Sequence, residues 1–189
     1  MKNFSMLILA ILLSTSFSKI YSQTAEEQKA WMEYMTPGPV QEMFAKYDGE
    51  WKSEISMWMD PSAAPMKMDG STSNKMILNG RYQYSTHTGT MMGMPFEGIM
   101  ILGYDNAKKM IVSSWIDNMG TGIMNMSGTW DEATKSATLY GTQTDPMTGK
   151  DIKVREVFKV LNDDSQSLEM YMDKEGAEMK SMEIMYFRK

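Results

Sequence analysis

The chain has 189 residues, with 19 Lys and Arg against 24 Asp and Glu, a formal net charge of −5 and no cysteine. This length is enough for one domain with a real core. The acidic balance argues against nucleic acid and anionic membrane as partners. The lack of cysteine excludes disulfides and thiolate metal sites. The composition has one unusual feature, its 24 methionines.

Residues 1–23 have the organisation of a secretory signal peptide. Lys2 supplies a short positive region, residues 6–13 form an apolar stretch, and small polar residues lead to Ser22, where cleavage is expected. The apolar stretch is too short to span a bilayer, as are all later hydrophobic runs. We therefore expect an exported protein, periplasmic or secreted, with no transmembrane segment in its mature form. A retained N-terminal anchor is the alternative.

Residues 24–47 predict a helical cap made of two short helices. Thr24 and Glu27 have the spacing of a capping box at the start of the first helix. The sequence Thr-Pro-Gly-Pro at residues 36–39 breaks that helix, and Pro39 suits the first turn of the next. Apolar residues then recur at helical spacing at Val40, Met43, Phe44 and Tyr47.

From residue 48 onward, apolar and polar residues alternate with period two between clusters of turn residues. The pattern predicts about ten strands, at residues 50–59, 67–78, 81–90, 96–104, 109–116, 121–130, 136–144, 151–161, 167–172 and 179–188. Short links make sequential strands antiparallel neighbours, and closure of such a meander removes its exposed edges. We therefore expect an all-β, up-and-down barrel in residues 48–189, with the second helix over one end.

The first and last predicted strands carry a pair of residues that closure would bring together. The first strand opens with Gly49 and Trp51, and the last ends with Arg188. Because these strands are neighbours in a closed barrel, the guanidinium can stack on the indole. We assign a structural role to all three residues.

Several segments, taken together, resemble an uncharacterised bacterial family, the domain of unknown function fifteen seventy-nine. They are residues 59–61, 74–78, 91–98, 103–106, 115–122 and 145–150, with Arg155 and Glu156. The resemblance runs in order from residue 35 to residue 189. It implies a lipocalin-like (calycin) barrel in an exported protein, and brings no activity, cofactor or catalytic residue. The Gly49, Trp51 and Arg188 set also resembles calycins in general.

The leading functional hypothesis is a binding module for a small apolar or amphipathic molecule. Barrels of this size have room for one ligand, and methionine side chains adapt their shape to varied apolar surfaces. The pocket candidates are Trp51, Met57, Met92, Met94, Trp115, Met124, Met126, Trp130, Glu156 and Tyr186. Cofactor, ligand identity and oligomeric state stay open.

A second hypothesis is that Cu(I) or haem binds through methionine pairs, with or without His87. Five pairs are spaced i, i+2, which places each pair on one face of a strand, and thioethers select Cu(I). Alternation also produces such pairs wherever methionine simply fills a barrel. His87 is the only histidine, with Met92 and Met94 close in sequence. A surface position for it is the interpretation that the sequence favours.

A third hypothesis is an enzyme with Glu156 as its acid or base. Glu156 falls on the inward register of its strand, between Val154 and Phe158. A carboxylate inside a barrel must be paired, hydrated or protonated, so it is either a polar anchor, a base, or half of an ion pair with a cation such as Arg81. No second catalytic group can be placed beside it. We therefore do not expect an enzyme and name no catalytic residue; a purely structural role stays open.

Overall fold

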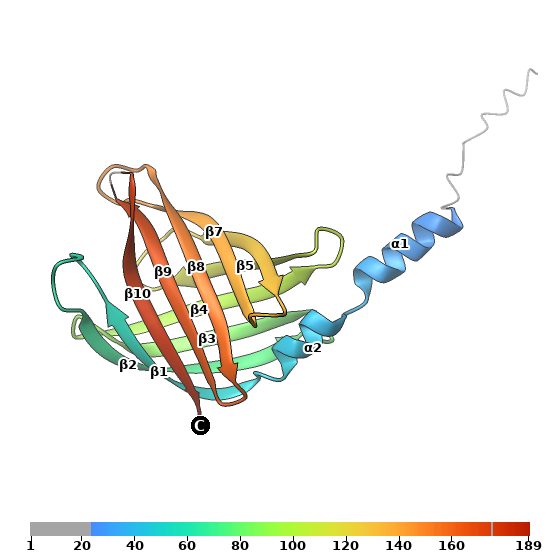
Figure 1. Ribbon diagram of the computed structural model, residues 1–189, viewed down its shortest axis with the longest axis horizontal. Helices are drawn as coiled ribbons and strands as arrows, with labels where there is room; N and C mark the ends of the chain where they lie inside the picture. The colour runs from blue at the N-terminus through green and yellow to red at the C-terminus, as the bar shows by residue number, and fades with distance from the viewer. Residues whose placement is uncertain (1–23, 175) are drawn as a thin grey trace, which may run out of the picture.

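Ten antiparallel strands close into a barrel in the computed structural model, which describes residues 24–174 and 176–189 (Figure 1). Each strand pairs with the next in sequence, and β1 pairs with β10 to close the sheet. The strands are β1 (Gly49–Met57), β2 (Met66–Ile77), β3 (Tyr82–Met91), β4 (Met94–Asp105), β5 (Met110–Asp117), β6 (Met124–Asp131), β7 (Ser136–Thr144), β8 (Asp151–Asn162), β9 (Ser165–Lys174) and β10 (Ala177–Arg188). The predicted all-β, up-and-down barrel is confirmed. The expected signal peptide, residues 1–23, lies outside the described residues.

Strand boundaries differ from the predicted ones mainly where turns are tighter or looser than expected. The β3–β4 turn needs only Met92 and Gly93, both at positive φ, so β4 begins at Met94 and runs through Pro95. The link between β5 and β6 is longer than predicted, and β6 begins at Met124. Strand β9 is longer at both ends because its flanking turns are short.

Two helices precede the barrel, as the sequence predicts. The first, α1 (Ala25–Met35), starts with the expected capping box between Thr24 and Glu27, and it buries none of its residues. Figure 1 shows it projecting away from the barrel, and Asn106 donates to backbone carbonyls at its C-terminal end. No helix in the described part of the chain has the length and apolar character needed to cross a bilayer.

The second helix, α2 (Pro39–Ala45), closes one end of the barrel. Its Phe44 is buried in a cluster with residues from β5 to β8, including Ile111 and Leu139. Gln83 on β3 donates from Nε2 to the Phe44 carbonyl at 2.8 Å. We call this the closed end. The opposite end, where β1 finishes and β2 begins, we call the open end (Figure 1).

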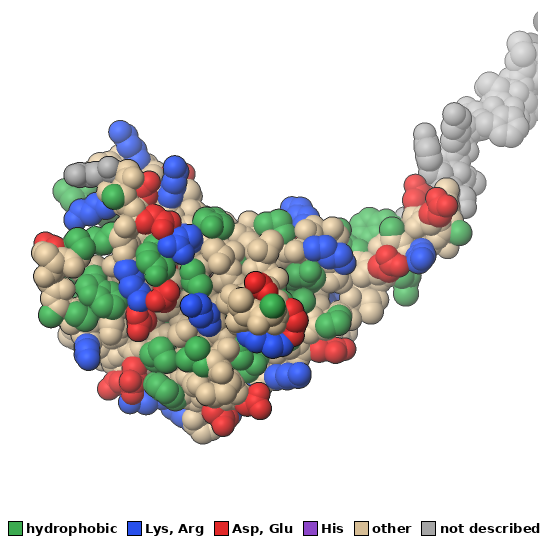
Figure 2. All heavy atoms as spheres, in the orientation of Figure 1, with side chains coloured by type: hydrophobic (Ala, Val, Ile, Leu, Met, Phe, Trp, Pro, Cys, Tyr) green, Lys and Arg blue, Asp and Glu red, His purple; other side chains and the backbone are tan. Residues whose placement is uncertain are grey.

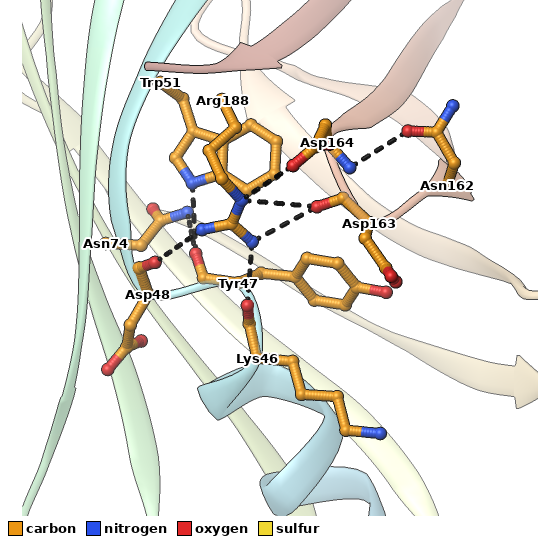
Figure 3. Close-up of polar contacts among 9 residues, drawn as sticks. All are labelled: Lys46, Tyr47, Asp48, Trp51, Asn74, Asn162, Asp163, Asp164 and Arg188. Carbon is orange, nitrogen blue, oxygen red and sulfur yellow. Dashed lines mark hydrogen bonds and ion pairs between the residues drawn. The ribbon is translucent and has the colours of Figure 1, made fainter.

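At the closed end, Arg188 fastens the last strand to the first (Figure 3). Its guanidinium carbon lies 4.4 Å from the centroid of the buried Trp51 ring. Its Nη1 and Nη2 donate to the carbonyls of Asp48 and Lys46 at 3.0 and 2.8 Å. Gly49 has a φ of 116°, which L side chains rarely adopt. The stacking predicted from the sequence is therefore confirmed, and glycine at position 49 meets a backbone requirement.

The outer surface carries charges of both signs close together. Figure 2 shows positive and negative side chains interspersed over the barrel on the face displayed. Arg155 and Glu178 are paired at 2.7 Å, and Lys180 bonds Glu169 at the same distance. On the displayed face, the two signs of charge are therefore mixed rather than gathered into separate patches.

Candidate ligand site

A small cavity lies inside the barrel toward the open end. Its volume is about 70 Å³, and strands β1 to β5 and β10 form its wall. The inward side chains around it are Ser53, Ile55, Met68, Thr72, His87, Met91, Phe96, Trp115, Met182 and Ile184. Most of these are apolar, so the few polar atoms decide what the cavity can bind.

His87 is held in the cavity wall by a chain of two hydroxyl groups. Cross-strand pairing places it opposite Thr72 on β2 and Gly98 on β4. The Thr72 Oγ1 atom is 3.0 Å from His87 Nδ1 and 3.0 Å from Ser53 Oγ. Burial lowers the pKa of His87 to about 4, so the imidazole is neutral at pH 7. Its other nitrogen, Nε2, is buried and has no hydrogen-bond partner among the described residues.

Trp115 forms the aromatic side of the cavity, and a glycine makes room for it. A Cβ at Gly98 would lie 2.5 Å from the Trp115 ring, closer than side chains tolerate. The His87 and Trp115 ring centroids are 5.0 Å apart at 64°, an edge contact, and Phe96 stacks on the indole at 6.3 Å. The indole N–H donates to Asp117 Oδ2 at 2.7 Å. This bond fixes the ring. Of the buried polar atoms without a hydrogen-bond partner, Ser85 Oγ, His87 Nε2 and Gln166 Nε2, only His87 Nε2 belongs to a residue that lines the cavity.

The cavity suits a small group with one hydrogen-bonding atom. A cavity needs a volume of about 10–15 Å³ to hold one water molecule, whereas the pockets that bind drug-sized ligands have about 300 Å³ or more. A cavity of about 70 Å³ therefore holds a few non-hydrogen atoms. If the Thr72 hydroxyl donates to Nδ1, Nε2 carries the proton and donates; in the other tautomer Nε2 accepts. Either tautomer offers the ligand one directed bond.

Glu156 lies inside the barrel on β8, opposite Leu139 and Met170. It is 9% exposed, and burial raises the pKa of its carboxyl group to about 7. Burial also raises the pKa of Tyr186, with a smaller contribution from the charge of Glu156. Arg81, the cation considered as a partner for Glu156, instead donates to the Leu78 carbonyl in the β2–β3 turn. The described ion pairs do not include Glu156.

The predicted pocket residues are spread over six places in the barrel. Trp115 lines the cavity, Met57 ends β1 at the open end, and Glu156 faces the interior. Two hydrophobic clusters take the next five residues: Trp51 and Tyr186 in one, and Met124, Met126 and Trp130 in the cluster below α2. Met92 and Met94 lie on the exposed β3–β4 turn, 59% and 49% exposed. The cavity lining does not include either of them.

Sequence reasoning favoured a surface position for His87, and the structure places the ring inside. The reason lies in β3, whose two faces are both largely polar, so alternation does not reveal which face is inward. Gln83 and Ser85 share the inward face with His87 and are buried. The partners Ser53 and Thr72 were also missed, because they become neighbours of His87 only through the register of β1, β2 and β3.

A larger hollow, of about 320 Å³, lies across the outer faces of β1, β2 and β10. Its rim carries Glu54, Asp69, Glu183 and Lys67. Nearby Lys52 already pairs with Glu54 at 2.9 Å and with Asp69 at 3.5 Å. Because Glu54 and Asp69 are already paired with Lys52 in solvent, the hollow offers less for specific binding than the interior cavity does.

Comparisons with known proteins identify a family and a fold. Residues 36–188 match a family model described as "Protein of unknown function (DUF1579)". No curated protein matches the sequence. Among solved structures, the crystal structure of Rv2717c from M. tuberculosis superposes with a TM-score of 0.62 at 13% sequence identity, covering 82% of this chain and 99% of that one. At this identity the likeness concerns the fold alone.

Proposed function

Because the chain belongs to the DUF1579 family and folds as a closed barrel, we propose that it binds a small apolar or amphipathic ligand at the open end. The observation that carries the proposal is the buried, unpartnered Nε2 of His87, a residue in the wall of a cavity that Trp115 and Phe96 also line. The signal-peptide pattern of residues 1–23 supports a location in the periplasm or outside the cell for this activity.

The free-energy cost of leaving His87 Nε2 without a hydrogen bond favours the binding of a ligand. A buried polar group without a partner costs about 1–3 kcal/mol, and the hydroxyl chain through Thr72 and Ser53 keeps His87 from turning away. A ligand that bonds Nε2 removes that cost while its apolar part covers aromatic surface. The protein therefore pre-organises one directed bond in an apolar setting, as ligand sites generally do.

The size of the cavity limits which part of a ligand enters. About 70 Å³ admits a polar head group or a small neutral molecule. An amphipathic ligand would place its head against His87 and its apolar tail toward the open end, where Met68 and Met91 are flexible enough to adapt. A neutral head is favoured because the buried His87 is itself neutral.

The single histidine makes a direct test practical. Protein labelled with ¹⁵N-histidine and carrying no affinity tag gives one imidazole signal set, because His87 is the only histidine. We expect small alcohols and phenol to shift the Nε2 resonance of His87, while toluene of similar shape shifts it much less. Native mass spectrometry of protein purified from its host periplasm should then show an adduct of small mass.

Two variants separate binding from general damage. Trp115→Phe should weaken the Nε2 response, whereas Met92→Leu on the exposed turn should leave it unchanged. An Nε2 signal that no probe moves, together with a clean apo mass from host-derived protein, would contradict the proposal.

A metal bound to His87 is the second candidate, and the same nitrogen favours it. A neutral imidazole with a free Nε2 is the form that ligates metals, and Met68 and Met91 line the same cavity. The described residues contain no group of three or more His, Cys, Asp or Glu side chains placed for a metal. Haem needs far more space than the cavity offers, so Cu(I) fits better. Anaerobic Cu(I) titration of the ¹⁵N-labelled protein decides this, since Cu(I) on Nε2 would move that resonance.

A further inference from the structure

Four inward-facing methionines lie in one row across four neighbouring strands. The register places Met66 opposite Met57, Met57 opposite Met182, and Met182 opposite Met170. These residues come from β2, β1, β10 and β9, of which β1, β10 and β9 run side by side in Figure 1. Directly opposed residues on one face of a sheet have Cβ atoms about 5 Å apart. Consecutive thioethers in the row are therefore close enough to share a ligand.

The burial pattern shows that the row faces the barrel interior. Met57 shares a strand face with the buried residues Trp51 and Ser53. Met182 lines the cavity and packs against the Trp51 cluster, and Met170 packs against the cluster below α2. All of the row's side chains are half-buried, so a bound ion would be shielded from water yet reachable from the open end.

We propose that Met57, Met182 and Met170 bind one Cu(I) ion, with Met182 as the central ligand. Thioether sulfur is a soft donor that selects Cu(I) among biological metals. Each outer methionine is the direct cross-strand neighbour of Met182, so the three thioether side chains lie next to one another on the inner face. Thioethers carry no proton, and the ion binds without any change of oxidation state.

The residue that continues the row carries a carboxyl group. Glu156 on β8 lies directly opposite Met170, and its carboxyl group is buried in the interior. Three neutral sulfur ligands leave the charge of Cu(I) uncompensated, and a buried charge needs a partner. When it is ionised, Glu156 provides a carboxylate on the adjacent strand that can balance this charge. At the other end of the row, Met66 is the first residue of β2 and lies at the open end, from which the ion would enter.

The other methionines that oppose one another in the described strands form separate pairs, Met172 with Met179 and Met91 with Met94. Met126 is buried and faces inward, but its cross-strand neighbours are Ser113 and Gly141. Its side chain packs with the cluster below α2, as expected of a residue that fills space. The contiguous row therefore goes beyond what a methionine-rich composition requires.

The test is an anaerobic Cu(I) titration of the purified protein against a chromophoric Cu(I) chelator. We expect transfer of one ion per chain, and at least tenfold weaker binding in Met182→Leu. Leucine keeps the volume and apolar character of methionine, so the fold should persist. The matched controls are Met92→Leu and Met147→Leu, which alter exposed methionines and should bind as the parent does.

A second readout locates the ion. Ag(I), which mimics Cu(I) and does not change oxidation state, is added to protein with ¹³C-labelled methionine methyl groups. The methyl signals of Met57, Met170 and Met182 should shift together at one equivalent, while the His87 Nε2 resonance stays in place. Shifts spread over exposed methionines, or binding that Met182→Leu leaves intact, would overturn the proposal. A shift of His87 Nε2 alone would place the metal at the cavity instead.

Discussion

The guanidinium of Arg188 covers the indole of Trp51, with 4.4 Å between the guanidinium carbon and the ring centroid (Figure 3). The contact joins the last strand to the first at the closed end. The indole Nε1 donates to the Tyr47 carbonyl at 3.1 Å, so both ring and cation are tied to the segment linking α2 to β1. One side chain thereby links barrel closure to the placement of the helix that covers it.

We expect Arg188→Ala to lower the free energy of unfolding by about 2–4 kcal/mol, since it removes a partly desolvated cation–π contact and charge-assisted bonds to backbone carbonyls. Arg188→Lys should lose roughly half as much, because lysine lacks the planar fork. Urea unfolding followed by Trp fluorescence measures both. Lys29→Ala, on the exposed face of α1, is the control and should change stability by less than about 0.5 kcal/mol. Equal stability of Arg188→Ala and the parent would show that the stacking is incidental.

The structure of the closed end could be predicted from the sequence, because its contacts are either local in the chain or follow from the pairing of the first strand with the last. The Gly49, Trp51 and Arg188 pattern needs only the first and last strands to be neighbours, and β7 has the boundaries predicted from alternation. The ligand cavity was not predictable in the same way. The contacts of Thr72 and Ser53 with His87 depend on the register of three strands, and register is weakly specified where both faces of a strand are polar, as in β3.

The position of the Trp115 ring could not be predicted from the sequence either, because it depends on the space that Gly98 leaves on the neighbouring strand β4. Gly98→Ala should push the indole away from His87, because the new Cβ would lie 2.5 Å from ring atoms. We expect a loss of about 1–3 kcal/mol, as for other overpacked positions, and a loss of the Nε2 response to ligand. Gly120→Ala is the matched control, since a Cβ there meets nothing within 4 Å. A Gly98→Ala protein with unchanged stability and Trp fluorescence would contradict this packing.

Glu156 should make stability fall as pH rises toward neutrality. Burial raises the pKa of its carboxyl group from 4.5 to about 7 in the folded protein. The folded state therefore retains a proton that the unfolded state releases. The stabilisation is complete below pH 4.5 and is lost as pH rises through about 7, by roughly 3 kcal/mol from a shift of this size. Glu156→Gln keeps the shape and cannot ionise, so its stability relative to the parent should increase between pH 5 and 8. Parallel unfolding curves for the two proteins across that range would refute the assignment.

His87 should make the stability of the protein fall as the pH drops below neutrality. Burial lowers the pKa of its imidazole from 6.5 to about 4, so between these values the unfolded state binds a proton that the folded state does not. Its contribution is complete above pH 6.5 and is lost as pH falls through about 4, again by roughly 3 kcal/mol. The difference in unfolding free energy between the parent and His87→Gln should therefore shrink from pH 7 to pH 4.

The ¹⁵N spectrum of the single histidine gives an independent check, because a neutral ring at pH 5 has distinct Nδ1 and Nε2 shifts. A ring that titrates near pH 6.5 would mean that His87 meets solvent, and the buried hydrogen-bonding site proposed for the ligand would have to be abandoned.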